Sequence, residues 1–315
     1  MKTIVAVKNL SHRYSKDWAI KDINFEIHQR GVLGLLGSNG AGKSTTMNIM
    51  CGVLDQTQGE VFINGINLAE NPLQAKKHIG FLPQNAPLHL ELTVDEYLTH
   101  CAYLRHIKKS KIKSAVDTSK EKCGISHFSN RLISNLSGGY RQRVGIAQAI
   151  IHNPALVVMD EPTNGLDPNQ VKAVRKLIKE IAQERAVILS THILPEVHAC
   201  CDGIKMIEQG KVVFSGSIDE FNNYIVPHSM ILNLENVPDI KQICMIKGIS
   251  QAEFINPKSI RIHFDGGQDV AETIIQASVK QNWQLRELSF ERSSLEEVFA
   301  SLSDQSNQTT GEWLS

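Results

Sequence analysis

The residues best suited to chemistry lie in a glycine-rich stretch that directly follows an apolar run. The run Val32 to Leu36 has the composition of a buried strand, and the stretch after it fits the pattern G-x-x-x-x-G-K-[ST]. Its members are Gly37, Ser38, Asn39, Gly40, Ala41, Gly42, Lys43 and Ser44, followed by Thr45. A strand that turns through glycines into a helix points backbone N–H groups and the positive helix end at one place. The pattern predicts a phosphate-binding loop; the competing interpretation is a glycine-rich turn that binds nothing.

Within this loop the residues have different predicted tasks. We expect Lys43 to reach the β- and γ-phosphates of a nucleotide and the Ser44 hydroxyl to bind Mg²⁺. Gly37, Gly40 and Gly42 carry no side chain, so the backbone can close around an anion without steric conflict. The loop thus predicts a nucleotide and Mg²⁺ as its ligands.

A pair of carboxylates follows a second apolar run, Leu156 to Met159. This run is typical of a buried parallel strand, and Asp160 at its end is placed to bind Mg²⁺ directly or through water. Glu161 comes next and can orient a water molecule for attack on the γ-phosphate, which makes it the candidate general base. Acidic residues at strand ends also serve as helix N-caps, which is the alternative interpretation.

Further motifs stand in a fixed order with these two. They are Gln84, the run Ser137-Gly138-Gly139, the loop Asn164-Gly165-Leu166-Asp167, and His192. From residue 37 to residue 192 the chain therefore resembles the ATP-binding cassette (ABC) family of transporter ATPases. The resemblance implies ATP and Mg²⁺ as ligands. It also implies an α/β fold, a P-loop NTPase cassette with a mainly parallel sheet, an antiparallel β subdomain and a helical subdomain.

The resemblance also implies that two copies of the cassette, most simply a homodimer, work head to tail. The phosphate loop of one copy then faces Ser137, Gly138 and Gly139 of the other, so that each ATP is held between two chains. Asp167 would communicate across this dimer. ATP binds the closed dimer better than the open one, and that difference drives closure.

Three other site residues are assigned through the same resemblance. Gln84 is expected to contact the nucleotide and its Mg²⁺, and His192 to contact the γ-phosphate and hold the attacking water together with Glu161. A histidine at a strand end can instead be purely structural. Tyr14 is the expected aromatic that stacks on adenine, with Trp18 as its rival and core packing as the alternative for both.

Among the family's branches, the chain looks like the exporter ATPases of the gliding-motility and multidrug type. Tyr140 stands where the wider family has Gln, and Asn164 where Ser is commoner. Neither change removes a phosphate-contacting group, because Ser137 keeps its hydroxyl and the two glycines keep their backbone N–H groups. The reaction class is therefore unaffected, while rate and dimer geometry are left open.

Composition places the transport path in another polypeptide. The 315 residues have a formal net charge of zero, and no stretch approaches the ~18 consecutive apolar residues of a membrane helix. We expect a cytoplasmic protein, peripheral on the cytoplasmic face of the inner membrane, with a separate permease of about six spans. The balanced charge gives no sign of the basic patch that binds nucleic acid. We interpret the lysines between 108 and 113 as a solvated helix surface.

The cysteines indicate neither disulfides nor a metal centre. Six cysteines occur without a disulfide-like spacing, which fits a reducing compartment. The cluster of His198, Cys200, Cys201 and Asp202 could be read as a metal site, but adjacent cysteines rarely both bind one ion. We interpret it as the end of a helix before the strand Gly203 to Ile207.

The chain divides into three predicted parts: an ATP-binding domain over 1–225, a small α+β domain over 226–303, and a polar tail over 304–315. Within the first, residues 92–127 are expected to be helical, with a core stripe of Tyr97, Cys101, Leu104 and Ile107. The second shows the order βαββαβ of a ferredoxin-like unit and ends in a capped helix over 293–299. It could regulate ligand access, support dimerisation or merely pack.

Two functions of different class fit the sequence. The first is an ATPase subunit that drives a separate membrane exporter. The second is an ABC ATPase that acts on ribosomes or DNA. The second class usually carries two fused cassettes or a long insertion, whereas this chain has one phosphate loop and a short interval from Gln84 to Ser137. The sequence therefore favours the exporter subunit, without naming the transported substrate.

Overall fold

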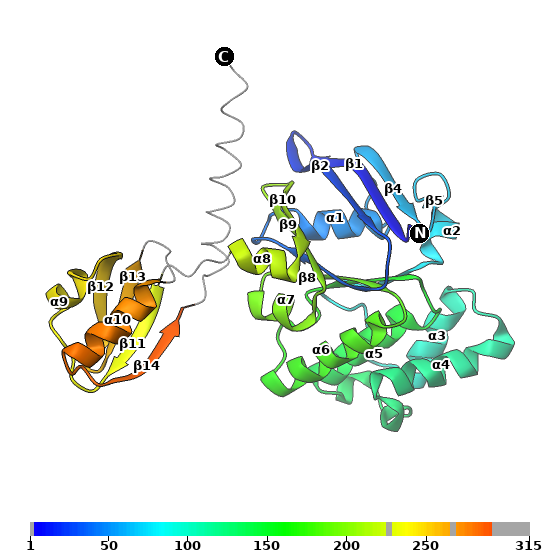
Figure 1. Cartoon of the computed structure of the whole chain (residues 1–315). Coiled ribbons are helices and arrows are strands. Elements are labelled where there is room, and N and C mark those ends of the chain that lie inside the picture. The colour runs from blue at the N-terminus through cyan, green and yellow to red at the C-terminus, as the bar shows by residue number, and fades with distance from the viewer. Residues whose placement is uncertain (1–2, 225–228, 265–268, 292–315) are drawn as a thin grey trace, which may run out of the picture. The chain divides into compact units, whose positions relative to one another are not determined.

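The computed structural model of the chain describes residues 3–224, 229–264 and 269–291 (Figure 1). Two compact units divide between Ile218 and Asp219. The domain bounds read from the sequence, at 225 and 303, stay predictions. The expected helix over 293–299 and the tail over 304–315 lie outside the described residues.

The first unit is built on a six-stranded sheet with the order β10-β9-β3-β8-β7-β6. Its strands are β3 (Gly31–Leu36), β6 (Ile79–Leu82), β7 (Leu156–Asp160), β8 (Ala186–Thr191), β9 (Gly203–Glu208) and β10 (Lys211–Ser217). All neighbouring pairs are parallel except β9 with β10. Every residue of β7 and β8 is buried, as expected for central strands covered on both faces. The mainly parallel sheet expected from the sequence is confirmed.

An antiparallel sheet lies over one face of the phosphate-loop helix (Figure 1). It has the order β2-β1-β4-β5, with β1 (Val5–Tyr14), β2 (Asp17–Ile27), β4 (Gln58–Ile63) and β5 (Ile66–Asn67). Its inward side chains share one apolar core with helix α1 (Lys43–Met50) and with strands β7 and β8. This shared core fixes α1, and with it the phosphate loop, between the two sheets.

The remaining helices of the first unit flank the main sheet. They are α2 (Pro72–Lys76), α6 (Pro168–Ala182) and α7 (Leu194–Cys200). Helix α8 (Ile218–Tyr224) begins at the division between the units, and its residues from Asp219 on belong to the second unit. Helix α6 shows why they pack: Val174, Leu177, Ile178 and Ile181 recur at helical spacing and are all buried. Among the described residues, no helix has the length and apolar character needed to cross a bilayer.

The helical subdomain contains α3 (Val94–Leu104), α4 (Lys109–Cys123), two short 3-10 turns η1 (Ser126–Phe128) and η2 (Ile133–Asn135), and α5 (Gly138–Ile150). Thr93 and Glu96 cap the start of α3 reciprocally, which explains its sharp N-terminus. The predicted core stripe was wrong at Leu104, which is 65% exposed. The buried face of α3 instead carries Val94, Tyr97, Leu98 and Ala102. Leu104 ends the helix, where the chain turns away through His106 at φ 55°.

The second unit has the predicted order of elements. These are β11 (Ser229–Leu234), α9 (Ile240–Cys244), β12 (Ile249–Asn256), β13 (Ser259–Phe264), α10 (Asp269–Lys280) and β14 (Leu285–Phe290). The four strands form an antiparallel sheet with the order β12-β13-β11-β14. This is the arrangement of a ferredoxin-like unit, with a core of its own that includes Leu232, Ile262 and Trp283.

Candidate active site

The phosphate loop runs from the end of β3 to the start of α1, and its glycines are required by geometry. Gly40 and Gly42 have φ values of 83° and 107°, in the left-handed region that side chains disfavour. A Cβ atom at Gly37 would lie 2.2 Å from the carbonyl oxygen of Ile207 in β9. The loop can therefore keep this tight turn only with the residues that the motif supplies.

Lys43, the first residue of α1, holds the loop from within. Its side chain is buried, and Nζ donates hydrogen bonds of 2.9 Å to the carbonyl oxygens of Gly37 and Ser38. Burial lowers the pKa of Lys43, while the carboxylates of Glu161, Asp160 and Glu208 oppose that shift. A cation is thus held at the start of α1, where the positive helix end also favours a polyphosphate.

Glu161 lies at the centre of a second hydrogen-bond network. Its carboxylate accepts from Gln84 Nε2 at 2.9 Å and from Asn164 Nδ2 at 3.2 Å, and it pairs with His192 Nδ1 at 2.8 Å. A carboxylate only accepts, so His192 carries its proton on Nδ1 in this arrangement. Three side chains from different segments therefore orient one carboxylate.

The backbone at Glu161 is strained, and Ser190 supports it. Glu161 has φ 45°, an uncommon value for a non-glycine residue. Its N–H donates to Ser190 Oγ at 3.1 Å, and the Ser190 hydroxyl donates in turn to Asp160 Oδ1. One hydroxyl near the end of β8 thus holds both the Glu161 backbone and the Asp160 carboxylate.

Buried Glu196 braces the loops on either side of this pair. It accepts hydrogen bonds from Thr163, two residues after Glu161, and from Thr191, which precedes His192. Arg175 of α6 lies 3.5 Å from the same carboxylate. Because Glu196 is only 3% exposed, these bonds connect the two loops through the protein interior.

An open pocket of about 490 Å³ collects many of the predicted site residues. Those that line it are Asn39, Gly40, Gly42, Lys43, Ser44, Thr45, Gln84, Glu161 and His192. Gly37, Ser38 and Ala41 belong to the same loop without lining the pocket. Asp160 does not line it either, but the Ser190 hydroxyl connects Asp160 to the backbone of Glu161, which does. We name this cavity the phosphate-loop pocket.

Other predicted residues lie outside it. Tyr14, Ser137, Gly138, Gly139 and Asp167 do not line the pocket of their own chain. Ser137 precedes α5 without a side-chain cap, and both it and Gly138 are exposed. Gly139 is buried where a Cβ atom would lie 2.5 Å from Gln170 of α6. Asp167 caps α6 through the backbone N–H groups of Asn169 and Gln170.

Both aromatic candidates for adenine stacking are available at the tip of the β1–β2 hairpin. Tyr14 is 53% exposed and Trp18 is 40% exposed. The Tyr14 ring meets His12 edge-on, whereas the guanidinium of Arg13 lies over Trp18. Ala19, next to Trp18, lines the phosphate-loop pocket. Core packing does not explain either ring, and the choice between them stays a prediction.

Four contributors were missed by reasoning from the sequence. Asn164 was noted only as a departure from the family pattern, yet it donates a hydrogen bond to Glu161, and Ser190, which accepts from the Glu161 N–H, was given no role. Glu208 accepts from the Ser38 hydroxyl at 2.9 Å. Ala19 lines the pocket from β2. Glu208 and Ser38 are 170 residues apart, so no local pattern could have joined them.

The cysteine cluster near residue 200 lies at the end of a helix. Helix α7 ends at Cys200, before strand β9, as the helix-end interpretation expected. Cys200 and Cys201 are buried, and Asp202 accepts from the backbone N–H of Val32 at 2.8 Å. Asp202 therefore fastens this segment to β3. In the part of the chain that the structure describes, no group of three or more His, Cys, Asp or Glu residues could hold a metal ion.

The fold and this site define a P-loop nucleotide-binding ATPase. Residues 20–164 match the family model of the ABC transporter. The chain is 35% identical over 215 residues to the bacitracin transport ATP-binding protein BcrA of Bacillus licheniformis, covering 68% of this chain and 69% of BcrA. It is 30% identical over 262 residues to the uncharacterized ABC transporter ATP-binding protein YxlF of Bacillus subtilis, covering 81% of this chain and 87% of YxlF. The chain belongs to the ABC transporter ATP-binding protein family.

Solved structures of ATP-binding cassettes are similar to it in fold. The cbiO1 protein of Clostridium perfringens, part of the ABC transporter complex cbiONQ, superposes with a TM-score of 0.65 at 28% identity, covering 71% of this chain and 92% of cbiO1. A dimeric cassette in a post-hydrolysis state with ADP and Pi gives a TM-score of 0.61 at 25% identity, covering 68% and 98%. The chain is thus an ATP-binding ATPase subunit with the cassette fold.

Proposed function

We propose that this chain is the ATP-hydrolysing subunit of an ABC exporter and that it drives a separate membrane permease as a head-to-tail dimer. The observation that carries the proposal is the Glu161 carboxylate, which Gln84 and His192 hold at the rim of a phosphate cradle organised by buried Lys43. This places a candidate base and a cationic phosphate site in one pocket.

The pocket fits ATP phosphates and has the donor set for Mg²⁺. Ser44 and Thr45 follow Lys43 in the first turn of α1, and Ser44 offers an exposed hydroxyl. Asp160 offers a carboxylate, and Gln84 uses Nε2 toward Glu161, which leaves its amide oxygen as a ligand. Ser44, Gln84 and Asp160 would hold the ion. Bound there, Mg²⁺ would neutralise charge on the β- and γ-phosphates.

Glu161 and His192 would then act on the attacking water. Glu161 accepts a proton from that water as the water attacks the γ-phosphate. His192 donates Nδ1–H to Glu161 and so fixes the direction of the carboxylate. Gln84 and Asn164 donate to the other carboxylate oxygen, which keeps Glu161 from rotating away from the pocket.

The exposed start of α5 supports a second copy as the partner. Ser137 and Gly138 are exposed and do not line their own chain's pocket, so they are available to another chain's nucleotide. Their hydroxyl and backbone N–H groups at a helix N-terminus suit a γ-phosphate. The solved dimeric cassette with ADP and Pi is a precedent for pairing within the family. Asp167 at the start of α6 would contribute to the same interface.

The exporter assignment follows the motif pattern and the similarity to BcrA, a bacitracin transport protein. The permease would be a protein of about six spans, with this chain peripheral on the cytoplasmic face of the membrane. A gene for such a membrane protein beside this one would support the assignment. Action on ribosomes or DNA is the weaker alternative, since no described feature favours it.

The substitution Ser137→Arg tests the dimer. A bulky cation at the start of α5 blocks the opposite chain's nucleotide without touching the pocket of its own chain. We expect monomer affinity for ATP to stay near wild type and steady-state ATPase activity to disappear. Ser110→Arg, an equal change on exposed α4, is the control. Retained turnover in Ser137→Arg would contradict the sandwich dimer.

A further inference from the structure

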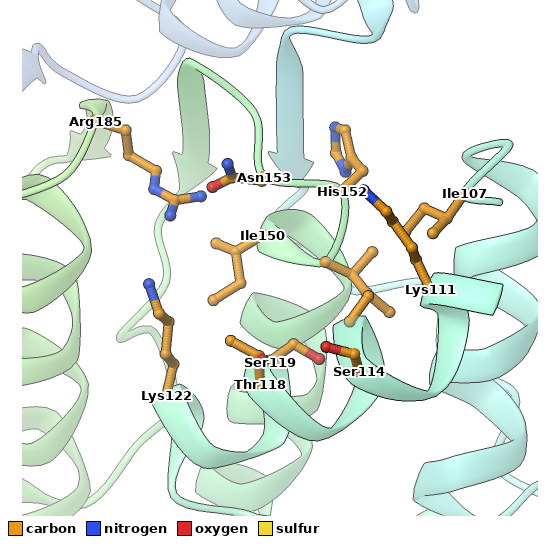
Figure 2. A pocket seen from close by; sticks show the side chains of 12 residues that line it. Ile107, Lys111, Ser114, Thr118, Ser119, Lys122, Ile150, His152, Asn153 and Arg185 are labelled. Carbon is orange, nitrogen blue, oxygen red and sulfur yellow. The ribbon is translucent and has the colours of Figure 1, made fainter.

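A second pocket, of about 720 Å³, lies between α4 and the segments that follow α5 and precede β8 (Figure 2). One face of α4 supplies Lys111, Ser114, Thr118 and Lys122, which recur at helical spacing. Arg185, immediately before β8, closes the opposite side. We name this cavity the α4 pocket; the phosphate-loop pocket shares no lining residue with it.

Arg185 is the feature that calls for a ligand. Its side chain is only 5% exposed, and Nη2 donates to Glu184 at 2.7 Å. Nε and Nη1 are buried and have no hydrogen-bond partner among the described residues. Buried guanidinium donors are normally satisfied by protein, water or ligand, because leaving them unpaired is costly. Figure 2 shows this guanidinium turned toward the hollow.

Positive charge exceeds negative charge around the pocket. Lys111, Lys122 and Arg185 line it, and no acidic side chain does. Glu184, outside the lining, pairs with both Lys122 at 2.5 Å and Arg185 at 2.7 Å. Lys122 and Arg185 therefore share one carboxylate, and Lys111 has no ion pair among the described residues, so two of the three positive charges are uncompensated. Lys111 is exposed, as expected for a solvated helix surface, and it also lines this pocket.

The positive charge and the lining residues of the α4 pocket together indicate which class of ligand it can bind. A phosphate monoester carries ~−1.5 to −2 charges near neutral pH and three strong acceptor oxygens. Arg185 and the lysines supply the donors, and the hydroxyls of Ser114 and Thr118 add further polar partners. Ile107, Ile150 and Ile151 form an apolar part of the lining where the ester's carbon chain can lie. We propose that the α4 pocket is a binding site for a phosphate monoester, separate from the ATP site.

Such a ligand would join two parts of the cassette. Lys111 and Lys122 belong to a helix of the helical subdomain, whereas Arg185 leads directly into central strand β8. A dianion bound by both would hold α4 against the sheet. Strand β8 ends at Thr191, next to His192, so the site is positioned to influence the catalytic segment.

Calorimetry on the full chain tests the site, with sn-glycerol 3-phosphate as the probe. The ATP site is first filled with Mg²⁺ and a non-hydrolysable ATP analogue, so that the phosphate loop cannot bind the probe. We expect one saturable site, weakened about tenfold in Lys111→Gln and in Lys122→Gln through loss of a charged hydrogen bond. Lys113→Gln is the matched control, because Lys113 is an exposed lysine of α4 that does not line the pocket.

Arg185→Gln gives the strongest test and needs a check on folding. The probe should raise the melting temperature of the wild type but not of Arg185→Gln, while the ATP analogue should raise both. If Arg185→Gln does not fold, the two lysine variants decide alone. Absence of saturable binding in the millimolar range, or equal losses in Lys111→Gln and Lys113→Gln, would overturn the proposal.

A second arm identifies the source of the monoester. Vesicles of phosphatidylcholine with and without phosphatidate are sedimented with wild type and Lys111→Gln. Saturable binding of glycerol 3-phosphate supports a soluble ligand. Lys111-dependent retention on phosphatidate vesicles supports a lipid head group. Retention that does not depend on Lys111, without binding of the soluble probe, contradicts the site.

Discussion

The two pockets of the cassette both contain a buried cation, but the cations are satisfied differently. In the phosphate-loop pocket, Lys43 donates hydrogen bonds to two carbonyl oxygens, and three carboxylates interact favourably with its positive charge. In the α4 pocket, Arg185 has one carboxylate partner and two nitrogens that are unpaired within the described residues. The first site is complete without its ligand, whereas the second leaves donors for the ligand to satisfy.

This difference also explains why only one pocket can be read from the sequence. A cradle of backbone N–H groups needs glycines at set positions, so it leaves a compact motif over residues 37–44. The α4 pocket is built from side chains between residues 107 and 185, and lysines on a helix surface are common. Sites made by backbone geometry are visible in a sequence, and sites made by tertiary contact are not.

The largest effect is expected from a substitution that stops hydrolysis in the phosphate-loop pocket and does not alter the α4 pocket. Glu161→Gln keeps the size of the side chain but removes the carboxylate that accepts a proton from water. We expect ATP hydrolysis to fall by ~10²–10⁴-fold, the usual contribution of a general base, while ATP still binds. Phosphate release and size-exclusion chromatography with Mg²⁺ and ATP measure both, and a trapped dimer should appear.

Glu121→Gln is the control for this change, since Glu121 is an exposed glutamate of α4 that lines neither pocket. Hydrolysis by Glu161→Gln within a few-fold of wild type would remove Glu161 as the base and leave His192 as the leading candidate. An inactive variant that stays monomeric would keep Glu161 as the base and show that closure needs the permease.

The next effect contrasts the two buried cations directly. Lys43→Ala removes the ammonium inside the loop and leaves the β- and γ-phosphates uncompensated. We expect ATP affinity to fall roughly 10²–10³-fold, the cost of breaking a buried charge pair. Arg185→Gln should leave ATP affinity unchanged, because Arg185 does not line the ATP site. Nucleotide titration of both variants measures this, and near-wild-type affinity in Lys43→Ala would remove Lys43 from the site.

A feature can be predicted from the sequence when the residues that form it lie close together in the chain. The phosphate loop, the Asp160–Glu161 pair and the βαββαβ order of the second unit come from short patterns, and the structure has those elements where they were expected. The exposure of Leu104 was missed because helical spacing does not say where a helix ends. Ser190, Asn164 and Glu208 were missed as partners because their contacts join separate strands and loops.

A third prediction concerns acid stability and uses His152 in the lining of the α4 pocket. Burial and the nearby Arg105 lower the pKa of His152 from 6.5 to about 4, and Nε2 donates to the carbonyl oxygen of Ile79. Between these two values the unfolded chain binds a proton that the folded chain does not. The stability contributed by neutral His152 is therefore complete above pH 6.5 and is lost as the pH falls toward 4.

We expect the wild type to lose up to about 3 kcal/mol of unfolding free energy from this group across that window. His152→Gln, which can still donate to Ile79, should lose less over the same range. Urea denaturation at pH 7 and pH 5 measures the difference, with His127→Gln as the control at an exposed histidine. If His152→Gln and wild type have the same pH dependence, folding does not lower the pKa of His152.

The smallest effect is expected at the adenine end of the phosphate-loop pocket. Binding there depends on side chains, as it does in the α4 pocket. Tyr14→Ala removes the expected stacking ring, and base–aromatic stacking contributes ~1–3 kcal/mol, so ATP affinity should fall roughly tenfold. Inorganic tripolyphosphate has no base, and its affinity should not change. Tyr14→Phe keeps the ring and should bind ATP as wild type does.

Trp18 is also exposed and precedes a pocket residue, Ala19. If Trp18→Ala loses ATP affinity and Tyr14→Ala does not, Trp18 is the residue that stacks on adenine. Its place beside pocket residue Ala19 would then predict the stacking ring better than the resemblance to the family does.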